Sequence, residues 1–182
     1  MKRLFTAMGL ALLMVAGGLA APAWAQDGEV AEAPQQADEK LATQVKELLA
    51  GFEYVPTRAD WEKLGPQAAG VLRQIAADPA TRATTRARAI SSLGYFPEPD
   101  TESFLSAVLS GEDQPSLLRR KALRALAFGF GEKALPQLTP YLSNDDKRLR
   151  ESAIRAVGLL KVDAARDALQ ARLPQEPSSY LQ

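Results

Sequence analysis

Residues 149–160 read LRESAIRAVGLL, and two earlier stretches repeat this pattern, LLRRKALRALAF at 117–128 and TTRARAISSLGY at 84–95. The aligned positions are separated by 33 and then 31 residues, and the copies agree in chemistry more than in letters. Within each copy the matching positions recur at i, i+4, i+5 and i+8, which places them on one face of a helix. The pattern therefore predicts three equivalent helices in one chain.

A second helix is predicted after each copy, because leucines recur downstream at the same offsets. These leucines are Leu105, Leu138 and Leu169, followed one turn later by Leu109, Leu142 and Leu173. The helices of the repeated copies, here called first helices, span about 84–94, 116–127 and 147–159. The second helices span about 66–76, 99–110, 132–142 and 163–173. An opening helix over 38–52, with Asp38 as its N-cap, is predicted to pair with the earliest second helix. Pro140 is expected to kink its helix or delay its start.

A self-similar helical hairpin of 31 to 33 residues is typical of an alpha-solenoid. Residues 144–158, NDDKRLRESAIRAVG, resemble the short HEAT repeat of the bilin-lyase-like type, with its aspartate, its arginine and its alanine–aliphatic tail ending in glycine. The resemblance extends over about 60–173, although Ala127 replaces the glycine in the middle copy. The predicted fold is therefore all-α, an alpha-solenoid of about four stacked HEAT-like hairpins. A plain antiparallel helical bundle is the alternative architecture.

The resemblance also implies a structural role for one recurring arginine. In repeats of this type, an aspartate near the turn and the arginine of the following helix resemble a bonded pair that joins neighbouring units. Carried over to this chain, the residues are Asp78, Asp113 and Asp145 with Arg86, Arg119 and Arg150. The alternative is that the three arginines form a ladder that binds an anionic partner.

The chain is predicted to begin with a signal peptide over 1–25. Lys2 and Arg3 precede a long apolar run, and Ala23-Trp24-Ala25 gives a small-x-small site for cleavage before Gln26. An uncleaved membrane anchor is the alternative, whereas a lipoprotein is excluded because the chain has no cysteine. The remaining segments are predicted as a flexible acidic leader (26–39), a HEAT-like repeat domain (40–174) and a C-terminal tail (175–182). The expected location is periplasmic or secreted, with no membrane attachment after cleavage.

Composition argues against several functional classes. The sequence contains neither histidine nor cysteine, the residues that most often serve as general base, nucleophile or zinc ligand. Its formal net charge of zero argues against a dedicated nucleic-acid binder. No catalytic residue, metal ligand or cofactor is therefore predicted, and the protein is not expected to be an enzyme. A serine–lysine pair cannot be assembled from spacing alone.

Basic residues gather on the first helices, where Glu151 is the single acidic residue. The candidate binding residues on this stripe are Arg88, Arg120, Lys121, Arg124 and Arg155. An acidic protein, an anionic polymer, a phosphate-bearing surface or the acidic leader would fit it; the alternative is a solvated face. Tyr95, Phe128 and Leu159 occupy one repeat position and are predicted as plugs between units, with a partner-binding patch as the alternative.

The sequence therefore predicts an exported, non-catalytic HEAT-repeat scaffold or adaptor that binds another protein. The alternative function is an enzyme, or a protein that handles a chromophore or another small ligand, on a bilin-lyase-like HEAT scaffold. The oligomeric state and the identity of the partner cannot be read from these residues.

Overall fold

The computed structural model describes residues 34–51 and 53–177. These residues belong to one compact unit, and the description below concerns that unit. Three predicted segments lie wholly or partly outside the described residues: the signal peptide (1–25), residues 26–33 of the acidic leader and residues 178–182 of the tail.

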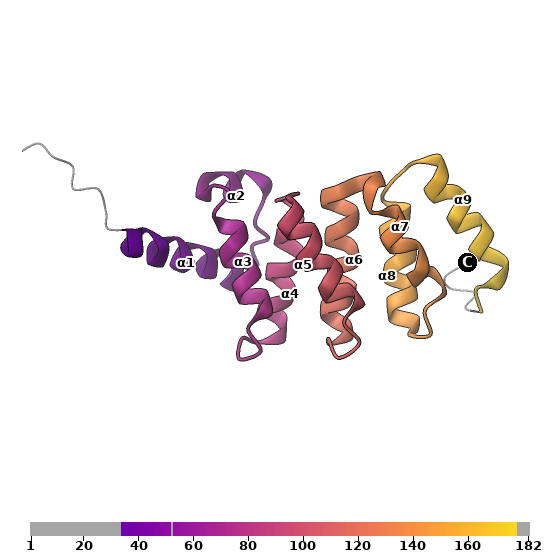
Figure 1. Cartoon of the computed structure of the whole chain (residues 1–182), viewed down its shortest axis with the longest axis horizontal. Coiled ribbons are helices and arrows are strands. Elements are labelled where there is room, and N and C mark those ends of the chain that lie inside the picture. The colour runs from indigo at the N-terminus through magenta and orange to yellow at the C-terminus, as the bar shows by residue number, and fades with distance from the viewer. Residues whose placement is uncertain (1–33, 52, 178–182) are drawn as a thin grey trace, which may run out of the picture. The chain divides into compact units, whose positions relative to one another are not determined.

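The described residues fold into helices joined by turns (Figure 1). In chain order the α-helices and 3-10 helices (η) are α1 Pro34–Ala50, α2 Arg58–Leu64, α3 Ala68–Ala77, α4 Ala83–Leu93, α5 Pro99–Ser110, α6 Ser116–Phe130, η1 Gly131–Ala134, α7 Leu135–Leu138, η2 Thr139–Ser143, α8 Lys147–Gly158, α9 Asp163–Arg172 and η3 Leu173–Gln175. Within this part of the chain, no helix combines the length and the apolar character needed to cross a bilayer.

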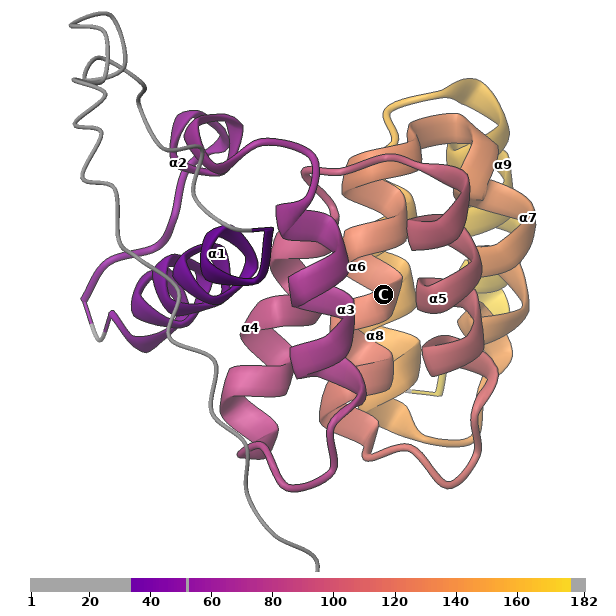
Figure 2. The same cartoon turned by 60° about the vertical axis from the view of Figure 1, so that its left-hand side comes forward.

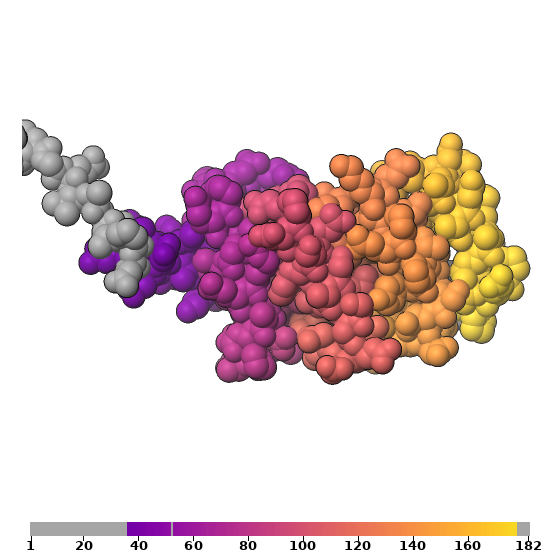
Figure 3. Space-filling model, in the orientation of Figure 1, coloured from indigo at the N-terminus to yellow at the C-terminus, as the bar shows by residue number. Residues whose placement is uncertain are grey.

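The first helices α4, α6 and α8 pack side by side in chain order and form one layer. The second helices form the other layer, in which α3 packs on α4, α5 on α6, and η2 and α9 on α8 (Figures 1 and 2). On the second-helix face, side chains fill the spaces between successive hairpins (Figure 3). This order of packing confirms the prediction of a small helical solenoid, because a bundle would close around one shared centre.

The repeated positions form the core of the solenoid. Ala89, Ala122 and Ala153 are fully buried, so each first helix places a small side chain in the core at the same repeat position. Leu138 is also fully buried, as the leucine repeat predicts, together with its equivalent Leu105. Neighbouring hairpins therefore bury their apolar faces against each other, which is the main stabilising term in such arrays.

The opening helix begins earlier than the sequence predicted. Since α1 begins at Pro34, Asp38 lies inside the helix and is not its N-cap, and residues 34–39 of the predicted acidic leader are helical. The helix packs against α3, as predicted, and also against α4 (Figure 2).

The short helix α2 was not predicted. Thr57 and Asp60 form a capping box at its start, and the Trp61 side chain is buried with its ring edge against Phe96, at 6.2 Å between centroids. The spacing of Thr57 and Asp60 was the available signal for this helix.

Prolines decide two other helix boundaries. Pro99 is the first residue of α5, where its missing N–H has no helical partner to lose. The helix expected over 132–142 is divided into η1, α7 and η2. Pro136 lies in the first turn of α7 and Pro140 in the first turn of η2, which confirms the predicted interruption at Pro140.

Candidate functional site

One groove of about 450 Å³ lies where α1, α4 and α6 meet. We call it the α4–α6 groove, and its lining residues are Leu48, Leu49, Val55, Pro56, Arg88, Ser91, Ser92, Tyr95, Lys121, Arg124, Ala125, Phe128 and Leu159. The lining among the described residues is apolar and basic, with two serines and no acidic side chain. It is therefore suited to a ligand that combines apolar groups with negative charge.

Large apolar side chains in this groove are exposed. The exposed fraction is 77% for Val55 and 53% for both Phe128 and Leu159. The Tyr95 ring meets the Phe128 ring edge-on, at 5.1 Å between centroids, and the Arg58 guanidinium lies 5.6 Å from the Tyr95 centroid. The interpretation of Phe128 and Leu159 as plugs between units is therefore wrong, because both side chains face solvent at the groove. Phe96, the neighbour of Tyr95, is buried instead.

Two glycines allow the ends of α4 and α6 to approach beside these rings. A Cβ built on Gly129 would lie 2.8 Å from the carbonyl oxygen of Gly94. A Cβ on Gly94 would lie 3.0 Å from a ring carbon of Phe128. The backbones therefore approach more closely than any residue with a side chain would permit at Gly129.

Three of the five predicted binding residues line the groove: Arg88, Lys121 and Arg124. The Arg88 Nη1 donates to the carbonyl oxygen of Leu49 at 2.6 Å, which connects α4 to the end of α1. Burial lowers the pKa of Lys121, and the neighbouring charges of Arg124 and Arg120 lower it further. The lysine is thus partly desolvated among like charges, an arrangement that an anionic ligand would relieve.

The other two predicted binding residues are engaged elsewhere. The Arg120 Nε donates to the Ser152 hydroxyl at 3.1 Å, so it joins α6 to α8. Arg155 forms an ion pair with Glu151 of its own helix, at 2.9 Å between nitrogen and oxygen. Neither residue lines the α4–α6 groove.

The recurring arginines bind backbone carbonyls at the ends of second helices. The Arg86 Nε donates to the carbonyl oxygen of Ala76 at 2.8 Å, and the Arg119 Nε donates to that of Leu109 at 2.9 Å. The third equivalent carbonyl, that of Leu142, accepts instead from Arg172 at 2.6 Å. A cation at a helix C-terminus satisfies a carbonyl that lacks a helical partner and complements the helix dipole.

The structure therefore corrects the prediction that these arginines form ion pairs with aspartate side chains. Within the described part of the chain, no ion pair joins Asp78 to Arg86, Asp113 to Arg119 or Asp145 to Arg150. Asp78 instead accepts hydrogen bonds in its own turn, from the Ala80 N–H at 2.9 Å and the Thr81 hydroxyl at 2.7 Å. The bond from Thr81 is the largest cause that lowers the pKa of Asp78, and the charge of Arg86 is a smaller one.

The neighbour of Asp145 connects two units. Asp146 caps α8 by accepting from the Arg148 N–H at 2.8 Å, and it also accepts from the Ser116 hydroxyl of α6 at 2.8 Å. The hydrogen bond from Ser116 is the largest cause that lowers the pKa of Asp146.

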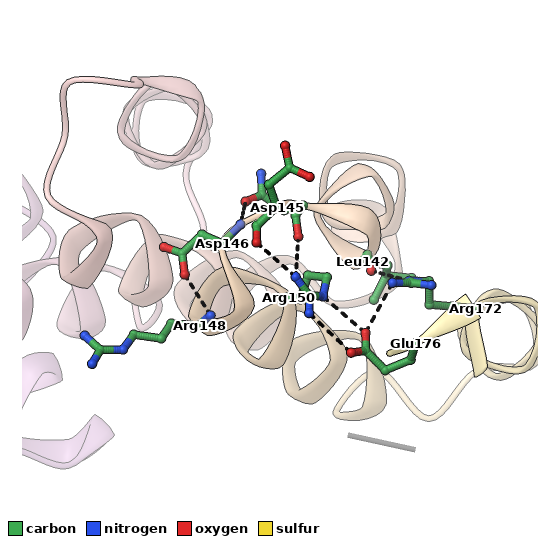
Figure 4. Close-up of polar contacts among 8 residues, drawn as sticks. Leu142, Asp145, Asp146, Arg148, Arg150, Arg172 and Glu176 are labelled. Atoms are coloured by element: carbon green, nitrogen blue, oxygen red, sulfur yellow. Dashed lines mark hydrogen bonds and ion pairs between the residues drawn. The ribbon is translucent and has the colours of Figure 1, made fainter. Parts of the chain in front are cut away.

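Arg150 connects the last hairpins to the C-terminal tail (Figure 4). Its Nη1 donates to the carbonyl oxygens of Asn144 and Asp145, at 2.9 and 3.0 Å. Its Nε and Nη2 donate to the two carboxylate oxygens of Glu176, which also accepts from Arg172 at 3.2 Å. Glu176 is almost completely buried and was not singled out in the sequence, because it lies outside the repeat.

Comparison with known proteins agrees with this architecture. A family model described as HEAT repeats matches residues 112–182, which contain the second and third copies of the repeated pattern. A search of curated proteins found no significant match. Together with the stacked hairpins, the match shows that residues 112–182 form a HEAT-repeat domain.

Proposed function

We propose that this protein is an exported, non-catalytic scaffold or adaptor that binds another protein at the α4–α6 groove. HEAT repeats commonly mediate protein–protein interactions, which supports the general role. The observation that carries the proposal is the coincidence, at one groove, of exposed Val55, Phe128 and Leu159 with the cations Lys121 and Arg124. Exposed apolar patches with a polar rim typically mark interaction sites.

The contacts of the groove serines support a non-catalytic role. Ser91 and Ser92 lie in the same groove as Lys121, whose lowered pKa would suit a general base. The Ser91 hydroxyl, however, donates to the carbonyl oxygen of Ala87 at 2.9 Å. Among the described residues, neither serine forms a hydrogen bond with Lys121. The pair therefore lacks the contact that would activate a serine nucleophile.

Site-specific photo-crosslinking in cells tests the binding role. A benzoylphenylalanine placed at Leu159, in the groove, is expected to form an adduct of one defined mass with a partner protein. The matched control is the same substitution at Leu173, which is 45% exposed and lies outside the groove. Absence of an adduct at Leu159, or the same adducts at both positions, contradicts the proposal.

The export part of the proposal rests on the sequence of residues 1–25. Expression of the full chain in a bacterium, followed by fractionation and mass spectrometry, should give a periplasmic protein that begins at Gln26. A protein that retains residues 1–25 in the membrane fraction would show that the segment is an anchor.

Binding of a small ligand is the second candidate function. The volume of the groove, about 450 Å³, falls within the range of small-molecule sites. The two functions are separated by native mass spectrometry and absorption spectroscopy of the purified protein. A bound chromophore or another small molecule, together with no crosslinked partner at Leu159, would favour this second function.

A further inference from the structure

We propose that the partner presents to the α4–α6 groove an acidic peptide segment that carries an aromatic or aliphatic side chain. In this arrangement its carboxylates meet Lys121 and Arg124, and its apolar side chain packs between Val55, Phe128 and Leu159. The inference rests on the proposed protein-binding function and specifies the chemistry of the partner.

The positive charges of the groove favour a ligand that carries carboxylates. Arg88 already donates to the Leu49 carbonyl, whereas the side chains of Lys121 and Arg124 form no ion pair or hydrogen bond with any described residue. Lys121 is half-buried beside two other cations, so its charge is desolvated without compensation by an anion. A carboxylate that enters the groove gains this attraction in surroundings less screened than open solvent.

The apolar walls call for a side chain beside those carboxylates. Val55 comes from the loop before α2, Phe128 from α6 and Leu159 from the residue after α8, so three segments contribute one apolar site. The Tyr95 ring packs edge-on against the Phe128 ring and extends this apolar surface. Aromatic pockets of this kind commonly contain the anchor residue of a protein–protein interface.

A peptide accounts for both features better than a lipid surface does. Lys121 lies in the recess of the groove, and a flat anionic membrane would reach protruding basic side chains rather than a half-buried one. The exposure of Val55, Phe128 and Leu159 also leaves the site open along the surface, which admits an extended chain.

The test is selection of binding peptides from a displayed library of random dodecapeptides. The bait is the protein purified after expression of the full chain, with whatever processing the cell carries out. The enriched peptides are expected to contain several aspartate or glutamate residues next to an aromatic or aliphatic one. Arg124→Glu and Phe128→Ser should each weaken binding of the synthetic enriched peptide by about tenfold or more, because they remove the charge and the apolar contact separately.

Arg148→Glu is the matched control, since Arg148 is an exposed cation at the opposite, N-terminal end of a first helix. It should leave the affinity within about twofold, because it lies outside the groove. Thermal melting of each variant checks the fold, and both groove substitutions replace exposed side chains. Replacing the peptide's acidic residues by their amides should weaken binding to a similar extent.

Two outcomes overturn the inference. One is enrichment of peptides that lack acidic residues or that bind the groove variants as well as the original protein. The other is a library that yields no specific peptide. Either result leaves the protein-binding function standing if Leu159 still crosslinks to a partner, and both proposals fail if that crosslink is also absent.

Discussion

Asp60 is a carboxyl group with a strongly lowered pKa. It accepts from the Thr57 N–H at 2.8 Å, from the Thr57 hydroxyl at 2.6 Å and from the Tyr54 hydroxyl. The side-chain hydrogen bond from Thr57, followed by that from Tyr54, lowers the pKa of Asp60 from 3.8 to about 2. The hydrogen bond between the Tyr54 hydroxyl and Asp60 also raises the pKa of Tyr54.

This shift predicts a dependence of stability on acid. Because the folded pKa lies below the unfolded value, the contribution of Asp60 is fully present above about pH 4 and is lost as the pH falls towards 2. Carbon-detected NMR titration of the carboxyl group should give a pKa near 2, and Thr57→Val should move it towards 3.8. An ordinary pKa in the unmodified protein would contradict the capping geometry.

The sequence alone predicted the roles of the arginines only in part. The recurrence of Arg86 and Arg119 at one repeat position predicted a structural role with aspartate partners, whereas each arginine donates to a backbone carbonyl. Every residue has a backbone carbonyl, so the sequence does not show which one an arginine binds. A nearby carboxylate, such as that of Asp78, is the partner that the sequence suggests instead. Arg120 and Arg124 differ in role for a similar reason, because the Ser152 hydroxyl that binds Arg120 is recognisable only once α6 and α8 are packed.

At the level of elements, an arginine of one helix completes the end of the helix before it. The Ala76 carbonyl at the end of α3 accepts from Arg86 of α4, and Leu109 at the end of α5 accepts from Arg119 of α6. The Leu109 carbonyl also accepts from the Tyr141 hydroxyl, at 3.2 Å. Arg86 is therefore the better position for a test, since no side chain of another described residue donates to the Ala76 carbonyl.

Replacing Arg86 by methionine keeps an unbranched apolar stem and removes the guanidinium donor. We expect Arg86→Met to lower the free energy of unfolding by roughly 1.5–3 kcal/mol, the range for a hydrogen bond to a charged group. Urea denaturation measures the difference. Arg124→Met is the control on another first helix, and because Arg124 is exposed it should change stability by less than about 0.5 kcal/mol. Equal effects would show that the bond to Ala76 contributes no specific stability.

Helix periodicity predicted the long elements and missed the short one. The helices α4, α5, α6, α8 and α9 agree with their predicted spans to within a few residues, because each repeats its apolar face over several turns. Helix α2 has seven residues and one buried side chain, Trp61, so no period could reveal it. Its existence depends on the capping box and on the tertiary contact with Phe96.

On the scale of the whole molecule, the end of the solenoid needs a cover. The last helix, α9, has no further hairpin beyond it in the described chain, and the segment after it returns to place Glu176 between Arg150 and Arg172. Terminal repeats commonly require such a cap, because their outer face would otherwise be exposed. The buried carboxylate also compensates two arginines that are themselves mostly buried.

Removal of this carboxylate should therefore be costly. Glu176→Ala is expected to lower the free energy of unfolding by about 3 kcal/mol, because it leaves both guanidinium groups without their anion. The exposed neighbour Gln175 supplies the control substitution, Gln175→Ala, which should have little effect. Chemical denaturation compares the two variants, and a Glu176→Ala protein as stable as the control would contradict a capping role for the tail.

The repeat predicted the stacking of hairpins, but it could not predict the whole groove. The basic wall, with Lys121 and Arg124, was visible as an excess of cations on the first helices. The apolar wall was visible only in part: Phe128 and Leu159 gave a partner-binding patch as an alternative to burial, and Val55 belongs to a loop outside the repeat. The exposure of a side chain at the end of a helix depends on how the neighbouring unit packs, and the amino-acid sequence alone does not show that packing.

The contact between Gly94 and Gly129 has a consequence for recognition. The backbones are in direct contact there. Tyr95 follows Gly94 and Phe128 precedes Gly129, so main-chain atoms fix the separation of these two aromatic residues. A surface whose walls are already in place gives up little conformational entropy when it is occupied. Such pre-organisation favours slow dissociation of a ligand that fits, and it leaves little capacity to adjust to one that does not.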